Sequence, residues 1–208
     1  GLGVYADGMV EHDGHVGQVL AKLDELGILD DTFIVYTTDN GAEAMSWPDG
    51  GTTVFKGEKN TSWEGGYRIP MLIRFPRAIE PGTVVNGIVS LEDILPTIMG
   101  ALGEPDLKEK LKQGYQVGDR TYKVHLDGYN FTPFIRDEEE NWPRKEFFYF
   151  TDDGDLAALR YQNWKVLFLE QRAEGFDVWR EPFVKLRAPY LFNLRTDPLE
   201  RAMHEAID

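Results

Sequence analysis

Apolar residues at helical spacing open the chain. Between residues 7 and 27 a valine or leucine recurs at roughly helical intervals, and a glycine follows the last of them. The apolar positions are Val10, Val16, Val19, Leu20, Leu23 and Leu26. Such spacing places apolar side chains on one face of a helix, and a glycine commonly ends one. The pattern predicts an amphipathic helix over residues 7–27.

Two short apolar runs predict buried strands. The first is β-branched and spans residues 32–38, and the second spans residues 71–75, where Pro76 ends it. Between them lies a long loop, at residues 41–66, that is rich in Gly, Asp, Thr and Trp. Short apolar runs bounded by turn residues are typical of strands in a sheet core.

A second helix is predicted at residues 92–102. Ser90 precedes it as a candidate N-cap, and Gly103 follows its last apolar residue. The first half of the chain therefore reads helix, strand, long loop, strand, helix. This order indicates an α/β sheet whose binding loops lie at the ends of strands.

The pattern changes after about residue 105. Charge runs at residues 108–112 and 137–140 predict solvated helix or loop, and residues 122–126 predict an extended piece. We find no internal repeat and no low-complexity tract.

The last third of the chain predicts an antiparallel meander. Four short strands are expected at residues 147–151, 156–161, 165–170 and 190–193. Turn sequences at residues 152–154 and 162–163 separate the first three. We therefore expect an α/β portion over residues 1–105, followed by a small antiparallel α+β subdomain over residues 106–208.

Composition narrows the function classes. The chain has 208 residues, is 42% hydrophobic, and carries 22 basic against 36 acidic residues, for a net charge of −14. That charge repels phosphate backbones, which argues against general nucleic-acid binding. No apolar run approaches the ~20 residues of a membrane span. Cysteine is absent, which excludes disulfides and thiolate metal sites. The sequence does not distinguish a cytoplasmic from a periplasmic or secreted location, and it does not indicate the oligomeric state.

The basic residues of the first half are clustered. Residues 1–104 contain 16 acidic residues but six basic ones, and five of those six lie between residues 56 and 77. The six basic residues are Lys22, Lys56, Lys59, Arg68, Arg74 and Arg77. A cationic cluster in an acidic half fits a site for a small anion, although charge alone fits solvated loop lysines equally well.

Asp39, Asn40 and Gly41 directly follow the first predicted strand. A carboxylate beside an amide offers the oxygen ligands that Ca²⁺ and Mg²⁺ take, and ligands bind at the carboxyl ends of strands in α/β sheets. The same tripeptide is also a common Asx-turn sequence, and by itself it favours the turn. The loop that follows adds Lys56 and Lys59 near a Gly-Gly pair, and such a lysine can neutralise an anion held against a metal.

These residues, taken together, resemble the sulfatase family. Asp39-Asn40-Gly41 closes a strand, Lys59 stands five residues before Glu64-Gly65-Gly66, and Arg-Ile-Pro follows at 68–70. Four later segments also match the family in order: LEDILPTI at 91–98, LDGYN at 126–130, ALRYQNWK at 158–165 and LFNLRTDPLE at 191–200. The last segment has Asn193 where the family usually has Asp. The resemblance covers nearly the whole chain.

The resemblance implies an alkaline-phosphatase-like α/β fold with a small antiparallel C-terminal subdomain. It implies that Asp39 and Asn40 are ligands of a Ca²⁺ or Mg²⁺ ion, and that Lys59 contacts the sulfate of a small-molecule ester and acts in catalysis. Lys56 is off the family pattern and is expected to be solvated. Glu64 and Arg68 are expected to form internal ion pairs that shape the loop.

Other parts of the family's site have no counterpart in this sequence. The family's nucleophile is a formylglycine made from Cys or Ser in a Cys/Ser-x-Pro-x-Arg motif. The segment SWPDG at 46–50 imitates the start of that motif but lacks the arginine and follows the Asp-Asn pair. We also expect His12 and His15, three residues apart, to lie on a helix surface and not to bind metal.

The expected function is therefore that of a C-terminal portion of an arylsulfatase-like sulfuric ester hydrolase, inactive without the formylglycine. From loop position alone, Trp47 and Met45 are expected to shape substrate selectivity. Two alternatives stay open. One is a phosphonate monoester hydrolase or phosphodiesterase of the same superfamily, and the other is a binding protein that has lost the nucleophile.

Overall fold

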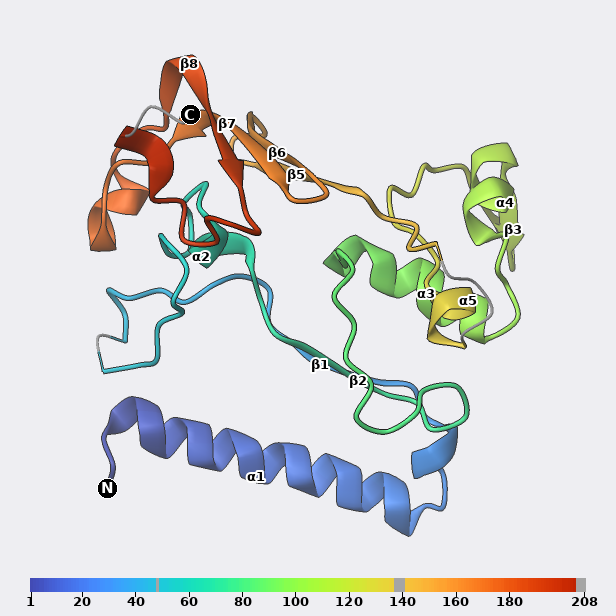
Figure 1. Cartoon of the computed structure of the whole chain (residues 1–208). Helices are drawn as coiled ribbons and strands as arrows, with labels where there is room; N and C mark the ends of the chain where they lie inside the picture. Colours follow the sequence, from blue (N-terminus) through green and yellow to red (C-terminus); the bar gives the residue numbers. More distant parts are fainter. Residues whose placement is uncertain (48, 137–140, 205–208) are drawn as a thin grey trace. The chain divides into compact units, whose positions relative to one another are not determined.

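The computed structural model describes residues 1–47, 49–136 and 141–204 (Figure 1). The chain packs as two compact units, Gly1–Ile73 with Glu146–Asp208 and Arg74–Lys145. Each is described by itself. The predicted division near residue 105 stays a prediction, and the charge run at 137–140 lies outside the described residues. No helix in the described ranges has both the length and the apolar character needed to cross a membrane.

Helix α1, Val4–Glu25, opens the first unit. It confirms the predicted helix but begins three residues earlier, and Gly27 at its end has a left-handed φ of 67°. No residue of α1 is fully buried. Of the apolar positions, Val16, Leu20 and Leu23 are half-buried, and the others are exposed. Its link to the neighbouring strand is polar, because His12 Nε2 lies 3.1 Å from the hydroxyl of Tyr36.

Strands β1, Ile34–Thr37, and β2, Met71–Arg74, pair as a two-stranded sheet. Both predicted strands are confirmed. The first is shorter at each end, and the turn η1, Leu29–Asp31, lies just before its start. The hydroxyl of Thr37 donates to the carbonyl of Pro70 at 2.8 Å, which joins the end of β1 to the start of β2. The long loop between these strands contains α2, Glu64–Tyr67.

A four-stranded antiparallel sheet completes the first unit. Its strands are β5, Glu146–Phe150, β6, Leu156–Tyr161, β7, Trp164–Glu170, and β8, Val184–Asn193, in the order β5-β6-β7-β8. The predicted meander and its two turns are confirmed. The β7–β8 connection contains η3, Gly175–Trp179, and a last turn, η4, covers Ala202–His204.

Strand β8 begins six residues before the predicted position. Pro189 obscured the earlier part, since proline lacks the N–H that a central strand donates. In the sheet β8 is an edge strand, where proline is tolerated. Moreover, the β7–β8 register shifts between Leu167, which faces Tyr190, and Leu169, which faces Lys185. Pro189 lies in this irregular stretch, so its missing donor is accommodated.

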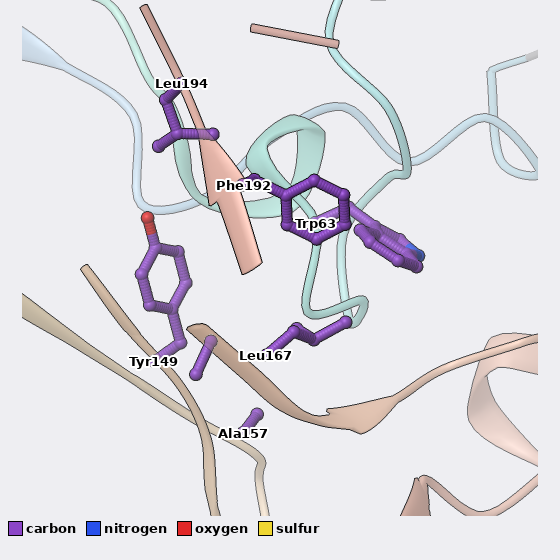
Figure 2. Packing of buried hydrophobic residues seen from close by; sticks show 7 residues of the cluster. Trp63, Tyr149, Ala157, Leu167, Phe192 and Leu194 are labelled. Carbon is purple, nitrogen blue, oxygen red and sulfur yellow. The ribbon is translucent and has the colours of Figure 1, made fainter. Parts of the chain in front are cut away.

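The core of the first unit joins the sheet to the loop before α2 (Figure 2). Its buried members are Trp63, Tyr149, Ala157, Ala158, Leu167, Phe192 and Leu194. The indole of Trp63, 3% exposed, meets the ring of Phe192 edge-on with centroids 6.1 Å apart. Aromatic pairs in this arrangement add to the free energy of simple burial. The core thereby fixes the end of the long loop on the sheet.

The second unit contains η2, Leu91–Asp93, α3, Ile94–Ala101, α4, Leu107–Gln113, the hairpin of β3, Tyr115–Val117, with β4, Arg120–Tyr122, and α5, Thr132–Ile135. The predicted helix is confirmed as η2 running into α3. The charge run at 108–112 forms most of α4, and of the predicted extended piece at 122–126 only Tyr122 belongs to a strand.

Asp93 is the polar centre of the second unit. It is 1% exposed, and Arg144 binds it through two nitrogens, Nε to Oδ2 at 2.8 Å and Nη2 to Oδ1 at 2.6 Å. The backbone N–H groups of Ser90 and Tyr129 also donate to its carboxylate. Asp93 therefore holds the segments 91–98 and 126–130 together, and its carboxylate oxygens are occupied by these partners.

Candidate functional site

The site begins where β1 ends. Asp39 is exposed and Asn40 is half-buried, one and two residues beyond the Thr37-Thr38 pair. The amide nitrogen of Asn40 donates to the carbonyl of Gly41 at 2.8 Å. The Asx-turn alternative requires the N–H of Gly41 to bond to the Asp39 carboxylate, but that N–H donates to the carbonyl of Gly66 at 2.9 Å. The carboxylate of Asp39 is thus not used to close this turn.

A close backbone contact follows immediately. A Cβ atom added at Gly41 would overlap the carbonyl group of Gly65. Gly65 is equally confined, since a Cβ there would overlap the carbonyl oxygens of Lys56 and Gly57. Only glycines allow the two stretches to approach this closely. The Asp-Asn-Gly turn and the Glu-Gly-Gly turn therefore meet backbone to backbone.

Lys59 lies on the loop that borders this contact. Its backbone N–H donates to the carbonyl of Ala42 at 2.9 Å, two residues after Asn40. Asn60 next to it has a left-handed φ of 62°, and its side chain donates to the carbonyl of Val178 at 2.7 Å. The ammonium of the half-buried Lys59 lies 5.4 Å from the ring centre of Trp179. The structure therefore brings the loop of Lys59 beside the segment that carries Asp39 and Asn40.

Two glutamates fasten these segments to η3. The carboxylate of Glu58 accepts the backbone N–H of Ala44 at 3.0 Å and that of Gly175 at 2.8 Å. Glu43 accepts the indole N–H of Trp179 at 3.2 Å. Sequence reasoning missed Glu43, Glu58 and Trp179, because no local pattern pairs residues from such distant segments. These contacts fix the position of Trp179 next to Lys59.

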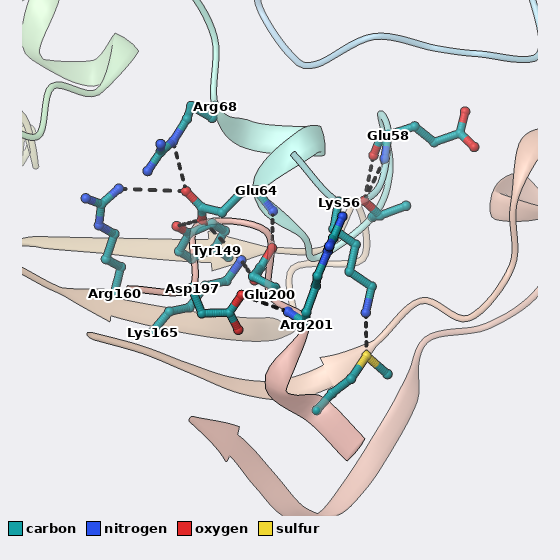
Figure 3. Close-up of polar contacts among 12 residues, drawn as sticks. Lys56, Glu58, Glu64, Arg68, Tyr149, Arg160, Lys165, Asp197, Glu200 and Arg201 are labelled. Atoms are coloured by element: carbon teal, nitrogen blue, oxygen red, sulfur yellow. Dashed lines mark hydrogen bonds and ion pairs between the residues drawn. The ribbon is translucent and has the colours of Figure 1, made fainter. Parts of the chain in front are cut away.

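A buried ionic cluster supports the loop from below (Figure 3). Its centre is Lys165, fully buried on β7, whose Nζ lies 2.7 Å from Glu200 Oε1 and 3.2 Å from Glu64 Oε1. Glu200 Oε2 accepts the backbone N–H of Glu64 at 2.8 Å, and the hydroxyl of Tyr149 donates to Glu64 Oε1 at 2.6 Å. Arg68 adds an ion pair to Glu64 Oε2 at 3.2 Å. Together these residues are termed the Lys165 cluster.

The Lys165 cluster joins three segments that lie far apart in the sequence. Glu64 comes from the Glu-Gly-Gly turn, Lys165 from the segment at 158–165, and Glu200 from the segment at 191–200. The expected internal role of Glu64 and Arg68 is confirmed. An inward-facing lysine on an alternating strand is a signal that buried acids must lie nearby, because an unpaired buried charge is costly.

Burial shapes the acidity of the cluster. Desolvation works to raise the pKa of Glu64, but Lys165, the Tyr149 hydroxyl and Arg68 outweigh it, so that the pKa lies below its ordinary value. Desolvation dominates for Glu200 and raises its pKa in spite of Lys165. The pKa of Tyr149 is raised well above its ordinary value by burial and by Glu64. Tyr149 is therefore a hydrogen-bond donor at neutral pH.

The expectation that Lys56 is solvated was wrong. Its Nζ lies 3.4 Å above the ring centre of Trp63 and 2.6 Å from the sulfur of Met203. Burial lowers the pKa of Lys56, although Glu200 and Glu170 oppose this. The long lysine stem covers the core indole, as amphipathic side chains often do.

The remaining candidates lie at the edge of these segments. Trp47 is 48% exposed and packs against Tyr5, with ring centres 6.3 Å apart. Its role in selectivity stays a prediction, as does that of Met45. The hydroxyl of Ser46 donates to Glu43 at 2.8 Å. His15 is exposed on α1 with His12, and its ring nitrogen lies 3.9 Å from Glu11.

Asp39 and Asn40 suit a hard cation by their chemistry, one carboxylate beside one amide oxygen. Within residues 1–47, 49–136 and 141–204, no three His, Asp or Glu side chains cluster closely enough to hold a metal ion. Two oxygen ligands are too few for Ca²⁺, which takes six to eight. The pair therefore fits part of a metal site and not a whole one.

Comparison with known proteins shows what the chain is similar to. The family model described as Sulfatase matches residues 1–104. Steryl-sulfatase of Mus musculus is 33% identical over 224 residues, covering 96% of this chain and 33% of its own length. Arylsulfatase A of Homo sapiens is 29% identical over 212 residues, covering 96% of this chain and 38% of its own length. The chain spans about a third of the length of these curated relatives.

A solved structure agrees with the sequence relatives. The PsFucS1 sulfatase from Pseudoalteromonas sp. superposes with a TM-score of 0.78 at 31% sequence identity, over 94% of this chain and 37% of that chain. The superposition confirms the predicted alkaline-phosphatase-like α/β class. It also confirms that the four-stranded antiparallel sheet is part of the shared fold.

Proposed function

Because the chain belongs to the sulfatase family, we propose that it forms part of the active site of a sulfuric ester hydrolase. In this proposal Asp39 and Asn40 are two ligands of a Ca²⁺ or Mg²⁺ ion, and Lys59 binds the sulfate group of a small-molecule ester. The observation that supports it best is the backbone bond from Lys59 to Ala42, which puts the loop of an anion-binding side chain beside the oxygen pair.

Asp39 and Asn40 would contribute through their oxygens. The amide of Asn40 is oriented by its bond to Gly41, which turns its nitrogen toward the backbone and leaves its oxygen to a ligand. The ion, when bound with further ligands, supplies Lewis acidity toward the oxygens of the sulfate. The carboxylate of Asp39 would balance part of the positive charge of the ion. The site chemistry is that of hard oxygen donors, which suits Ca²⁺ or Mg²⁺ over softer metals.

Lys59 would act on the charge of the sulfate. A half-buried ammonium interacts more strongly with an anion than a solvated one, because less water screens it. Its backbone is fixed by Ala42 and the next residue is fixed by Val178, so the base of the lysine side chain is positioned before substrate arrives. Preorganised charge of this kind stabilises the transition state of group transfer.

The nucleophile implied by the family resemblance is a formylglycine. The sequence has no Cys and no Cys/Ser-x-Pro-x-Arg motif that could form it. We therefore expect the 208-residue chain by itself not to hydrolyse sulfate esters. Release of 4-nitrophenol from 4-nitrophenyl sulfate by the purified chain, above a heat-denatured control, would contradict this expectation.

The test of the proposal uses an enzyme with the full length of its relatives that contains this chain. Lys59→Met should lower kcat/KM for 4-nitrophenyl sulfate by about 100-fold or more, the usual effect of removing one preorganised charge contact. Asp39→Ala should lower it similarly and raise the Ca²⁺ or Mg²⁺ concentration needed for half-maximal activity after chelation. Lys22→Met is the matched control, since Lys22 is exposed on α1 and pairs with Glu25.

The same assay separates the alternatives. Faster turnover of 4-nitrophenyl phosphate or of a phosphonate monoester than of the sulfate would favour a phosphoesterase. Binding of sulfate esters without turnover of any of the three would favour a binding protein. Equal activity of Lys59→Met and Lys22→Met would remove Lys59 from the site.

A further inference from the structure

A cavity of about 890 Å³ adjoins the candidate site on the side of the antiparallel sheet. It lies within the first unit, between the β5–β6 turn, the connection that contains η3, and the start of β8. Asn60 and Trp179 line it together with residues of these three segments and with Phe168 and Leu169 of β7. Its volume falls in the range of pockets that hold small organic ligands.

Lys59 connects this cavity to the candidate sulfate site. Asn60 is the next residue in the chain, and Trp179 is the ring above which the Lys59 ammonium lies, at 5.4 Å. Trp179 is 42% exposed, although its indole N–H is fixed by Glu43. A sulfate held by Lys59 would therefore lie next to Trp179, whose indole also lines the cavity.

The lining is both polar and aromatic. Asp152 and Asp155 from the β5–β6 turn line the cavity together with Lys185 and Arg187 from β8, and Trp179 adds a flat apolar surface. Within the described residues, none of these four charged side chains has an ion-pair partner. Their hydrogen-bonding capacity is consequently available to a ligand, with carboxylates to accept from hydroxyl groups and cations to donate to ring oxygens.

We propose that this cavity binds the sugar ring of a monosulfated saccharide, with Trp179 as the stacking surface. This proposal rests on the proposed function, since it takes the sulfate to lie at Lys59. A sterol would need a lining without charged groups, because leaving unpaired charges against hydrocarbon is costly. The lining carries four carboxylates, of Asp152, Asp153, Asp155 and Glu181, against the two cations of Lys185 and Arg187, so this excess of negative charge disfavours a multiply sulfated or carboxylated sugar. A neutral polyhydroxylated ring satisfies the lining best.

The test compares three substrate types in the full-length enzyme. These are 4-nitrophenyl sulfate, cholesteryl sulfate, and a panel of galactose and glucose monosulfates that differ in the sulfated hydroxyl. The wild-type enzyme should hydrolyse at least one monosulfated sugar with a higher kcat/KM than cholesteryl sulfate. Trp179→Ala should lower the ratio of kcat/KM for that sugar to kcat/KM for 4-nitrophenyl sulfate by about tenfold, a usual effect for one pocket contact.

Three variants make the result specific. Trp179→Phe keeps a ring face and should restore most of the ratio even though the bond to Glu43 is lost. Asp155→Asn should lower the ratio by raising KM for the sugar. Trp164→Ala is the matched control, an exposed tryptophan on β7 that does not line the cavity, and it should leave the ratio unchanged.

The outcomes distinguish the two proposals. If no sulfate ester is hydrolysed, the proposed function fails first. If 4-nitrophenyl sulfate is hydrolysed but every sugar monosulfate is ignored, or if Trp179→Ala and Trp164→Ala give the same ratio, the proposed function stands and the sugar-binding cavity is overturned. Faster hydrolysis of cholesteryl sulfate than of any sugar would also overturn it. Urea denaturation of each variant checks that a lower ratio of the two kcat/KM values does not come from misfolding.

Discussion

Replacing Lys165 by methionine would remove the only ammonium from the Lys165 cluster while keeping most of the side-chain volume. Glu64 and Glu200 would then share a buried space, at 2% and 0% exposure. The nearest remaining cations to Glu64 are Arg68 at 3.2 Å and Arg160 at 3.8 Å, both more exposed than the acids. Breaking a buried ion pair on one side costs about 3–5 kcal/mol of folding free energy.

That loss should be easy to measure. For a protein of this size, 1 kcal/mol lowers the melting temperature by about 2–4 °C, so Lys165→Met should melt roughly 6–20 °C below the wild type. Urea unfolding followed by tryptophan fluorescence gives the free energy directly, since Trp63 lies in the adjoining core. Lys185→Met is the control, because Lys185 is exposed on β8 of the same sheet, and its effect should stay within about 0.5 kcal/mol.

The pH dependence gives a second check. Burial raises the pKa of Glu200 in the folded protein, and the loss of Lys165 should raise it further. An acid with a raised folded pKa binds its proton more tightly when folded, so stability is gained as pH falls through that pKa. The deficit of Lys165→Met should therefore be smaller at pH 5 than at pH 8, and adding Glu200→Gln should reduce it. A deficit below about 1 kcal/mol at pH 8 would refute the reasoning that the lysine neutralises buried acids.

Two further outcomes follow from the same contacts. Glu64 has a folded pKa below the unfolded value near 4.5, so its contribution to stability is complete above that value and is lost as pH falls through the folded pKa. Glu64→Gln should therefore flatten the decline of the urea midpoint between about pH 5 and pH 3. Curves of urea midpoint against pH that run parallel for the variant and the wild type would contradict this. Gly41→Ala should lower the free energy of unfolding in urea by about 1–3 kcal/mol and lower sulfatase activity in the full-length enzyme, because the new Cβ must displace Gly65. The control Gly51→Ala, where nothing lies within 4 Å of the new Cβ, should lower it far less. An equal loss at the two glycines would count against the close contact.

The sequence predicted the regular elements well where periodicity was local. The helix at the start, the two strands around the long loop, and the meander all followed from spacing and turn residues. The start of β8 was missed because Pro189 disguised an edge strand as a loop. The boundary errors elsewhere are a few residues at element ends, where capping and tertiary contacts decide.

The candidate site was less accessible to sequence reasoning. Asp39-Asn40-Gly41 alone favoured a turn, and the family resemblance, not the spacing, suggested a metal pair with Lys59. The position of Trp179 could not be foreseen, since it depends on a bond to Glu43 from a segment 136 positions earlier. Lys56 was misjudged because its packing on Trp63 depends on a distant core. Contacts of this kind leave no periodic trace in a single chain.

The distance in sequence between Glu64 and its buried partners, Lys165 and Glu200, has a consequence for synthesis on the ribosome. Lys165 follows Glu64 by 101 positions and Glu200 follows it by 136. At about 5–20 residues per second, Glu200 is made roughly 7–27 s after Glu64. Before Lys165 is made, a folded loop would bury the Glu64 carboxylate with only Arg68 to pair with it, and before Glu200 is made the buried backbone N–H of Glu64 would lack its acceptor. We therefore expect residues 56–66 to stay open until the last motif emerges. Nascent chains stopped before Glu200 should accordingly be cut by protease in this loop, while finished chains resist.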